Sequence, residues 1–171
     1  DVEALRALIQ ETERLDSNVR FRLAGDLEAV SRNGDWGRAE FLGEKSLPRI
    51  ADFLAESNLG ICLLKDSEAM QKAFPAKVYE YLGAGLPVLA APTGEFTEFL
   101  TERDVGMVFP KADPQAMAQA IVELKADPTA WNRMSDNAWA LRSSLDRRDG
   151  ANRFAERLER IHETSVKGKL N

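Results

Sequence analysis

Short apolar runs alternate along the chain with amphipathic stretches of helix length. The runs are rich in Val, Ile, Leu and Phe, and they lie at residues 19–24, 39–42, 59–64, 87–91 and, more weakly, 105–109. Glycine, proline, aspartate or asparagine bounds each run, which is typical of strands. Strands that alternate with helices form parallel sheets covered by helices on both faces. The pattern therefore predicts an α/β fold.

Caps and apolar spacing mark the helices. Asp113 and Asp127 are each followed by proline, and this pair begins a helix because the carboxylate caps the N-terminus while proline fits the first helical position. Apolar residues at helical spacing predict further helices at residues 5–9, 46–54 and 154–161. Together with the strands, these helices indicate one doubly wound domain.

The chain opens inside a helix. A doubly wound domain normally begins with an apolar strand and a glycine-rich turn, and neither precedes the first helix here. We therefore expect residues 1–171 to be a fragment of a longer protein, one doubly wound domain with its first strand missing.

Composition excludes several classes of function. The chain has 23 Lys plus Arg against 28 Asp plus Glu, a net charge of −5, and no basic cluster that would bind nucleic acid. With one cysteine and one histidine, it cannot form an internal disulfide, a His/Cys metal site or a His-based triad. We expect Cys62 in the core and His162 on a solvated helix edge. No apolar run approaches the roughly 18 residues of a membrane span.

The candidate chemistry lies in residues 74–92, which read FPAKVYEYLGAGLPVLAAP. Pro75 and Gly85 predict a helix of about three turns between them. Lys77 falls in the first turn, where the helix dipole disfavours a cation, so an anion docked there would be held by backbone N–H groups and the ammonium together. Glu80 follows one turn later on the same face, and a carboxylate can accept two hydrogen bonds from a ribose diol.

Structural interpretations of the same residues stay open. On spacing alone, Lys77 and Glu80 form an exposed intrahelical ion pair worth about half a kcal/mol. Gly83, which costs about 1 kcal/mol inside a helix relative to alanine, indicates either an early helix end or a closely packed backbone. Spacing therefore leaves both a nucleotide site and a plain helix surface possible.

These residues resemble a known family. Residues 75–90, preceded by LLKDS at 63–67 and followed by Glu95 and Glu98, look like the donor-binding domain of glycosyltransferases with the GT-B fold. The nearest group is glycosyltransferase family 4, as found in bacterial surface-polysaccharide synthesis. The likeness runs from about residue 19 to about residue 140, and it also includes the strings FRLAGD at 21–26, AEFLG at 39–43 and DPQAM at 113–117.

The resemblance implies a site. Lys77 would lie near the diphosphate and Glu80 would hold the ribose hydroxyls, and both would be the catalytic residues of this half. The residues implied to line the turn against the phosphates are Phe74, Pro75 and Ala76, and Gly43 is implied to lie near the nucleobase, with Phe41 and Glu44.

The chain also departs from the family pattern. Many retaining members carry Glu-x7-Glu, and the first Glu would fall at Lys72. Glu68 is too far upstream to replace it, so the stereochemical outcome stays open. Lys72 either adds positive charge near the diphosphate or is a solvated loop lysine. There is no Asp-x-Asp to hold a metal, and we expect no cofactor beyond the donor substrate, with a UDP-sugar favoured.

The resemblance further implies that residues 1–171 are a single Rossmann-like nucleotide-sugar-binding domain, a fragment of a longer two-domain protein. Its N-terminal domain would bind the acceptor, and without that domain this half is expected to be inactive in transfer. We expect a cytoplasmic protein that is peripheral to the inner membrane only through that other domain. Two alternatives stay open: a sugar-nucleotide epimerase of the same architecture, and a non-catalytic Rossmann-like interaction module.

Overall fold

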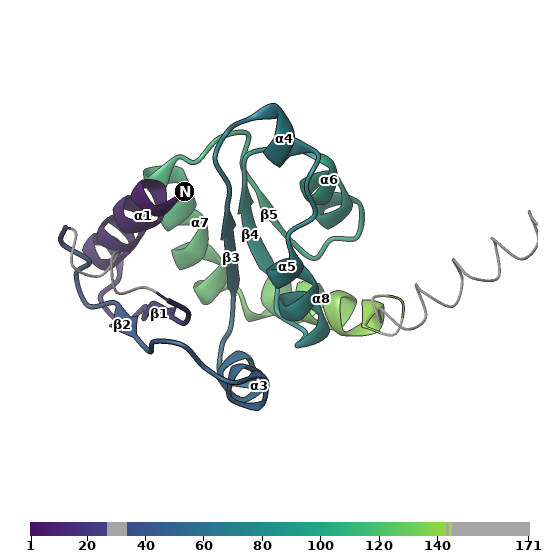
Figure 1. The fold of residues 1–171 in the computed structure, drawn as a ribbon, viewed down its shortest axis with the longest axis horizontal. Coiled ribbons are helices and arrows are strands. Elements are labelled where there is room, and N and C mark those ends of the chain that lie inside the picture. Colours follow the sequence, from purple (N-terminus) through teal and green to yellow (C-terminus); the bar gives the residue numbers. More distant parts are fainter. Residues whose placement is uncertain (27–33, 143, 145–171) are drawn as a thin grey trace, which may run out of the picture.

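The computed structural model describes residues 1–26, 34–142 and 144, and Figure 1 shows its ribbon. Strands and helices alternate along most of the chain. The strands are β1 (Arg22–Leu23), β2 (Glu40–Phe41), β3 (Gly60–Leu63), β4 (Val88–Ala91) and β5 (Gly106–Val108). The helices are α1 (Val2–Leu15), α3 (Leu47–Ala55), α4 (Glu68–Gln71), α5 (Ala76–Gly83), α6 (Glu95–Glu102), α7 (Pro114–Ala126) and α8 (Pro128–Leu141).

The strands form two parallel sheets. β1 pairs with β2, and β3, β4 and β5 follow one another in that order in a second sheet. Each strand lies within a run predicted from the sequence, so the α/β class is confirmed. β1 and β2 are two residues long, shorter than their apolar runs, because ladder pairing covers only the middle of each run.

The three-stranded sheet carries apolar side chains on both faces. Leu63 and Leu89 pack with α1 and α7 on one side, whereas Cys62, Val88 and Ala90 pack with α5, α6 and α8 on the other. This alternation follows from the two-residue period of a strand. Cys62 is fully buried, which confirms its predicted place in the core.

Side-chain caps begin the two C-terminal helices as predicted. Asp113 accepts a hydrogen bond from the Ala116 N–H at 3.1 Å, and Asp127 accepts one from the Ala130 N–H at 2.9 Å. The predicted helix at residues 154–161, His162 and the tail lie outside the described residues.

Two helices were not predicted. α4 is a single turn, too short for a periodic signal. The N-cap of α6 is Gly94, which has no side chain to cap the helix. Instead the Gly94 N–H donates to the Thr97 hydroxyl at 2.6 Å, so the usual N-cap signal is absent from the sequence.

Within the described ranges, none of the helices combines the length and the apolar character needed to cross a membrane. The same residues contain no group of three His, Cys, Asp or Glu side chains placed to hold a metal ion.

Candidate functional site

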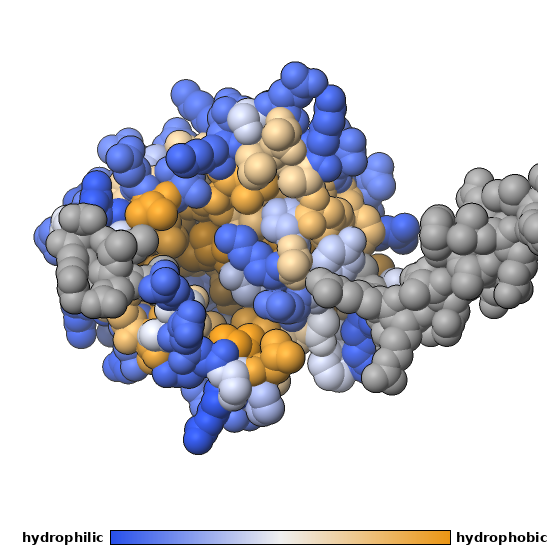
Figure 2. Space-filling view, viewed as in Figure 1, coloured by the Kyte–Doolittle hydropathy of each residue, from blue (hydrophilic) through white to orange (hydrophobic). Residues whose placement is uncertain are grey.

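A cavity of about 1130 Å³ opens between β1 and β3. Figure 2 shows an apolar recess near the middle of this face, bordered by polar side chains. Residues from β1, β3, α3, α5 and α7 line the cavity. Helix α5 contributes Lys77, Glu80 and Tyr81, so the segment with the candidate chemistry forms part of its wall.

The N-terminus of α5 lies at the carboxyl edge of the larger sheet. α5 belongs to the crossover between the parallel strands β3 and β4, so it runs against their direction. Pro75 is the N-cap, with a φ of −65°. The Val78 N–H donates to the Pro75 carbonyl at 3.0 Å, which leaves the N–H groups of Ala76 and Lys77 as the outward donors of this turn.

Lys77 and Glu80 are both exposed and both line the cavity. In the described part of the chain neither side chain takes part in an ion pair. The intrahelical ion pair that spacing alone favours is therefore not formed. An ammonium and a carboxylate, one helical turn apart, are instead available to a third group in the cavity.

The Lys77 charge also affects the pKa of Cys62 in β3. Burial raises the pKa of the Cys62 thiol, and the nearby Lys77 ammonium opposes this rise. The Cys62 thiol is fully buried and stays neutral at physiological pH, so it is a packing residue.

The helix that carries these residues is shorter than predicted. It has eight residues and ends at Gly83. A Cβ at Gly83 would meet nothing within 4 Å, so this glycine marks the helix end and not a closely packed backbone. Gly85 has a φ of +74°, as expected for the left-handed residue beyond a helix, and its carbonyl accepts from the Ser135 hydroxyl at 2.7 Å.

Tyr81 fixes α5 against β3. Its hydroxyl donates to the Ile61 carbonyl at 3.4 Å, and its ring occupies the place where Gly60 lacks a side chain. Burial raises the pKa of Tyr81 to about 12, with smaller contributions from Cys62 and Glu80. Sequence reasoning missed this residue, although its position four residues after Lys77 puts it on the same helix face.

The other predicted site residues do not line the cavity, although all of them are described. Phe74 packs in an aromatic cluster, with ring centroids 4.5 Å from Tyr79, 5.6 Å from Phe99 and 6.2 Å from Phe96. It therefore anchors the turn that enters α5, together with the half-buried Pro75. Ala76 is exposed at the first position of the helix.

Gly43 lies in the loop after β2, with a φ of +66°, and its carbonyl accepts from the Gly25 N–H at 3.0 Å. It joins the ends of β1 and β2. Neighbouring Phe41 packs edge-on against Trp36, with ring centroids 5.5 Å apart. A role near a nucleobase stays a prediction for this loop.

Lys72 stands where the family pattern has its first Glu. Its ammonium pairs with Glu68 at 2.8 Å on the exposed surface of α4 and the turn that follows. Because Glu68 already balances this charge, Lys72 is a weaker candidate for diphosphate binding than Lys77.

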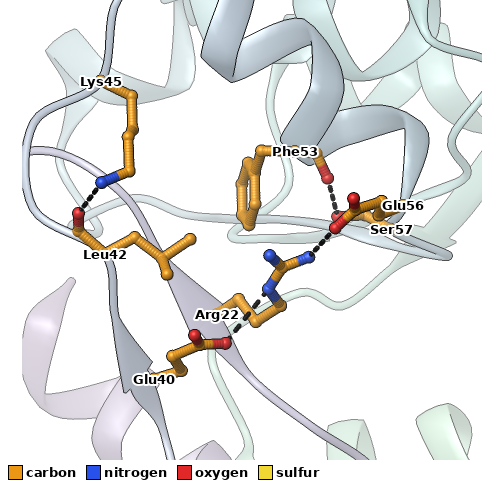
Figure 3. Close-up of polar contacts among 7 residues, drawn as sticks. All are labelled: Arg22, Glu40, Leu42, Lys45, Phe53, Glu56 and Ser57. Carbon is orange, nitrogen blue, oxygen red and sulfur yellow. Dashed lines mark hydrogen bonds and ion pairs between the residues drawn. The ribbon is translucent and has the colours of Figure 1, made fainter.

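Arg22 and its acidic and aromatic neighbours, which the sequence did not indicate, form another part of the cavity wall (Figure 3). The Arg22 guanidinium contacts Glu40 at 3.3 Å and Glu56 at 3.0 Å, and it lies 4.9 Å from the centre of the Phe53 ring. These contacts join β1, β2 and the end of α3. Nearby, the Lys45 ammonium donates to the Leu42 carbonyl.

Comparison with solved structures shows the same fold in several glycosyltransferases. WaaG, a glycosyltransferase involved in lipopolysaccharide biosynthesis, matches with a TM-score of 0.61 and 19% identity over 85% of this chain and 38% of its own. Anabaena Alr3699/HepE in complex with UDP-glucose matches with a TM-score of 0.72 and 23% identity, over 90% of this chain and 44% of its own. A glycosyltransferase from Rickettsia africae ESF-5 matches with a TM-score of 0.68 and 16% identity, over 92% of this chain and 45% of its own.

This chain spans less than half the length of each of these proteins. No curated protein matches it. A sequence model of the family described as glycosyl transferases group 1 matches residues 1–127, which is most of the chain. The resemblance stated from the sequence is thereby confirmed, and the chain belongs to the group 1 glycosyl transferase family.

Proposed function

We propose that this chain is the donor-binding half of a glycosyltransferase, and that it binds a nucleotide-diphosphate sugar at the N-terminus of α5. The observation that supports this most is the pair Lys77 and Glu80, which line one cavity one turn apart without pairing to each other or to another side chain among the described residues. Family membership supports the reaction class, and the UDP-glucose complex of Alr3699/HepE supports a UDP-sugar as donor.

Lys77 and the first turn of α5 bind the diphosphate in this proposal. Transfer breaks the anomeric C–O bond and leaves negative charge on the departing diphosphate. The Lys77 ammonium and the outward N–H groups of Ala76 and Lys77 lower the barrier, because they hold that charge more strongly as it grows. The helix dipole adds to the same effect.

Glu80 holds the ribose. Its carboxylate lies one turn further along α5, away from the diphosphate end of the helix, and it can accept hydrogen bonds from both hydroxyls of a ribose at once. Its negative charge also disfavours a phosphate at this position, so the nucleotide is bound in one orientation. In this proposal Lys77 thus binds the diphosphate end of the diphosphate–ribose unit, and Glu80 binds its ribose end.

The acceptor side of the reaction belongs to the rest of the protein. We propose an N-terminal domain in the same longer chain, and a role in surface-polysaccharide or glycoconjugate synthesis, with any membrane contact made by that other domain. The chain alone should bind the donor but not transfer its sugar, since the acceptor groups and any catalytic base would come from across the interdomain cleft.

Calorimetric titration with UDP, GDP and ADP tests the proposal. We expect one of these nucleoside diphosphates, UDP in the first place, to bind with a measurable heat, and the same nucleotide to raise the melting temperature by mass action. Inorganic pyrophosphate is the matched control for simple anion binding, and it should bind more weakly than UDP. If none of the nucleotides binds a well-folded protein, the fold serves as an interaction module instead.

A further inference from the structure

The start of α6 packs against the segment that enters α5. A Cβ at Gly94, the N-cap of α6, would lie 2.4 Å from the Gln71 carbonyl oxygen at the end of α4. Figure 1 shows α4 beside the start of α6. In addition, the Phe74 ring packs against two phenylalanine rings of α6, with centroids 5.6 and 6.2 Å away. The first turn of α6 therefore lies next to residues 72–75, which lead into α5.

α5 and α6 begin at the same edge of the larger sheet. α5 belongs to the crossover from β3 to β4, and α6 belongs to the crossover from β4 to β5. All three strands are parallel, so each helix starts near the carboxyl end of the strand before it. Both helices pack on the face of the sheet that carries Cys62, Val88 and Ala90. Their first turns are therefore neighbours at the carboxyl edge.

The backbone at the start of α6 is held by its own contacts. The Gly94 N–H donates to the Thr97 hydroxyl at 2.6 Å, and that hydroxyl donates to the Gly94 carbonyl at 2.8 Å. Thr97 is buried. A backbone fixed in this way costs little to order when a ligand binds to the side chain that it carries.

That side chain is Glu95, the exposed first residue of α6. In the part of the chain that the structure describes, its carboxylate forms no ion pair. Two acidic groups between β3 and α5 are already engaged: Asp66 accepts from the Gln71 amide at 3.1 Å, and Glu68 pairs with Lys72 at 2.8 Å. Glu95 thus offers a carboxylate at this edge to a ligand.

The order of groups in a nucleotide-diphosphate sugar indicates which part would meet Glu95. The diphosphate lies between the ribose and the sugar. In the proposed site Glu80 holds the ribose in the second turn of α5, and Lys77 holds the diphosphate in the first turn. The sugar would then lie beyond the first turn, on the side away from Glu80, where the entry to α5 meets the start of α6.

We propose that Glu95 binds two hydroxyl groups of the donor's sugar and selects an uncharged sugar over one with a carboxylate. A carboxylate can accept hydrogen bonds from two neighbouring hydroxyls at once, and it repels a second negative charge at close range. This inference rests on the proposed function, because Lys77 and Glu80 set the direction in which the donor lies. α5 then recognises the nucleoside diphosphate, and α6 recognises the sugar.

The test compares three ligands by calorimetric titration of the full 171-residue chain: UDP, UDP-glucose and UDP-glucuronic acid. The variant is Glu95→Gln, which keeps the length of the side chain and removes its charge. Glu102→Gln is the matched control, because Glu102 is also exposed and is the last residue of the same helix. Melting temperatures are measured alongside, since an acidic group in a first helical turn also stabilises the helix.

In Glu95→Gln we expect an unchanged affinity for UDP, an affinity for UDP-glucose that is lower by about tenfold, and a higher affinity for UDP-glucuronic acid. Glu102→Gln should leave all three affinities unchanged. A role in helix stability alone would lower the melting temperature and would not change the two sugar nucleotides in opposite directions.

If the wild type binds UDP but Glu95→Gln changes all three affinities by the same factor, or changes none of them, Glu95 does not bind the sugar and the nucleotide site still stands. If the wild type binds none of the three ligands, the proposed function fails and this inference fails with it.

Discussion

Replacing Lys77 by alanine is expected to weaken UDP binding roughly tenfold to hundredfold. A hydrogen bond to a charged group contributes about 1.5–3 kcal/mol, and each 1.4 kcal/mol corresponds to about a factor of ten in affinity. Folding should be nearly unchanged, because the Lys77 side chain is exposed and the described structure gives it no ion pair to lose. The measurement is calorimetric titration of wild type and Lys77→Ala with UDP.

Lys125→Ala is the matched control. Lys125 lines the same cavity and carries the same charge, but it lies at the end of α7 and pairs with Asp16 at 2.5 Å. Its removal should leave the UDP affinity unchanged and alter the melting temperature little, since exposed ion pairs contribute about 0–1 kcal/mol. If well-folded Lys77→Ala binds UDP as tightly as wild type does, Lys77 does not bind the diphosphate.

Raising the pH from 10 to 12 is expected to destabilise the protein through Tyr81. The pKa of this tyrosine is about 12 in the folded state against an ordinary value of 10.0. Between these values the unfolded state loses the proton and the folded state keeps it, so the free energy of unfolding falls as pH rises. Below pH 10 both states keep the proton and the full stability is present. The shift corresponds to a loss of about 2–3 kcal/mol by pH 12.

Denaturant unfolding at a series of pH values measures this loss. In Tyr81→Phe, the part of the decrease in the free energy of unfolding between pH 10 and 12 that comes from Tyr81 should disappear. At neutral pH the free energy of unfolding should fall by no more than about 1.5 kcal/mol, since only the hydrogen bond to Ile61 is lost. Tyr79→Phe is the matched control because it removes the other tyrosine hydroxyl of the chain, and it should keep the wild-type slope. If the free energy of unfolding of Tyr81→Phe falls between pH 10 and 12 as steeply as that of the wild type, Tyr81 does not cause this loss of stability.

Local signals in the sequence predict most of the fold. The strands are short apolar runs, and the helices at Asp113 and Asp127 carry an aspartate cap followed by proline, features that depend only on neighbouring residues. α6 was missed because Gly94 leaves the capping to Thr97. The same locality explains why Lys77 and Glu80 were placed correctly on one helix face.

Contacts between distant residues were not predictable in this way. Arg22 and Glu56 are 34 positions apart and nothing in their spacing links them. Tyr81 reaches Ile61 only because Gly60 leaves room for its ring. Phe74 looks like a turn residue in the sequence, but three other aromatic rings surround it. Which side chains reach the cavity therefore depends on how the elements pack.

A crystal structure of the protein soaked with UDP tests the nucleotide site most directly. We expect the diphosphate to lie within hydrogen-bond distance of the Lys77 ammonium and the N–H groups of the first turn of α5, with the ribose hydroxyls on the Glu80 carboxylate. A UDP molecule bound elsewhere, with Lys77 and Glu80 in contact only with solvent, would contradict the assignment and leave the fold and the family as the established properties of this chain.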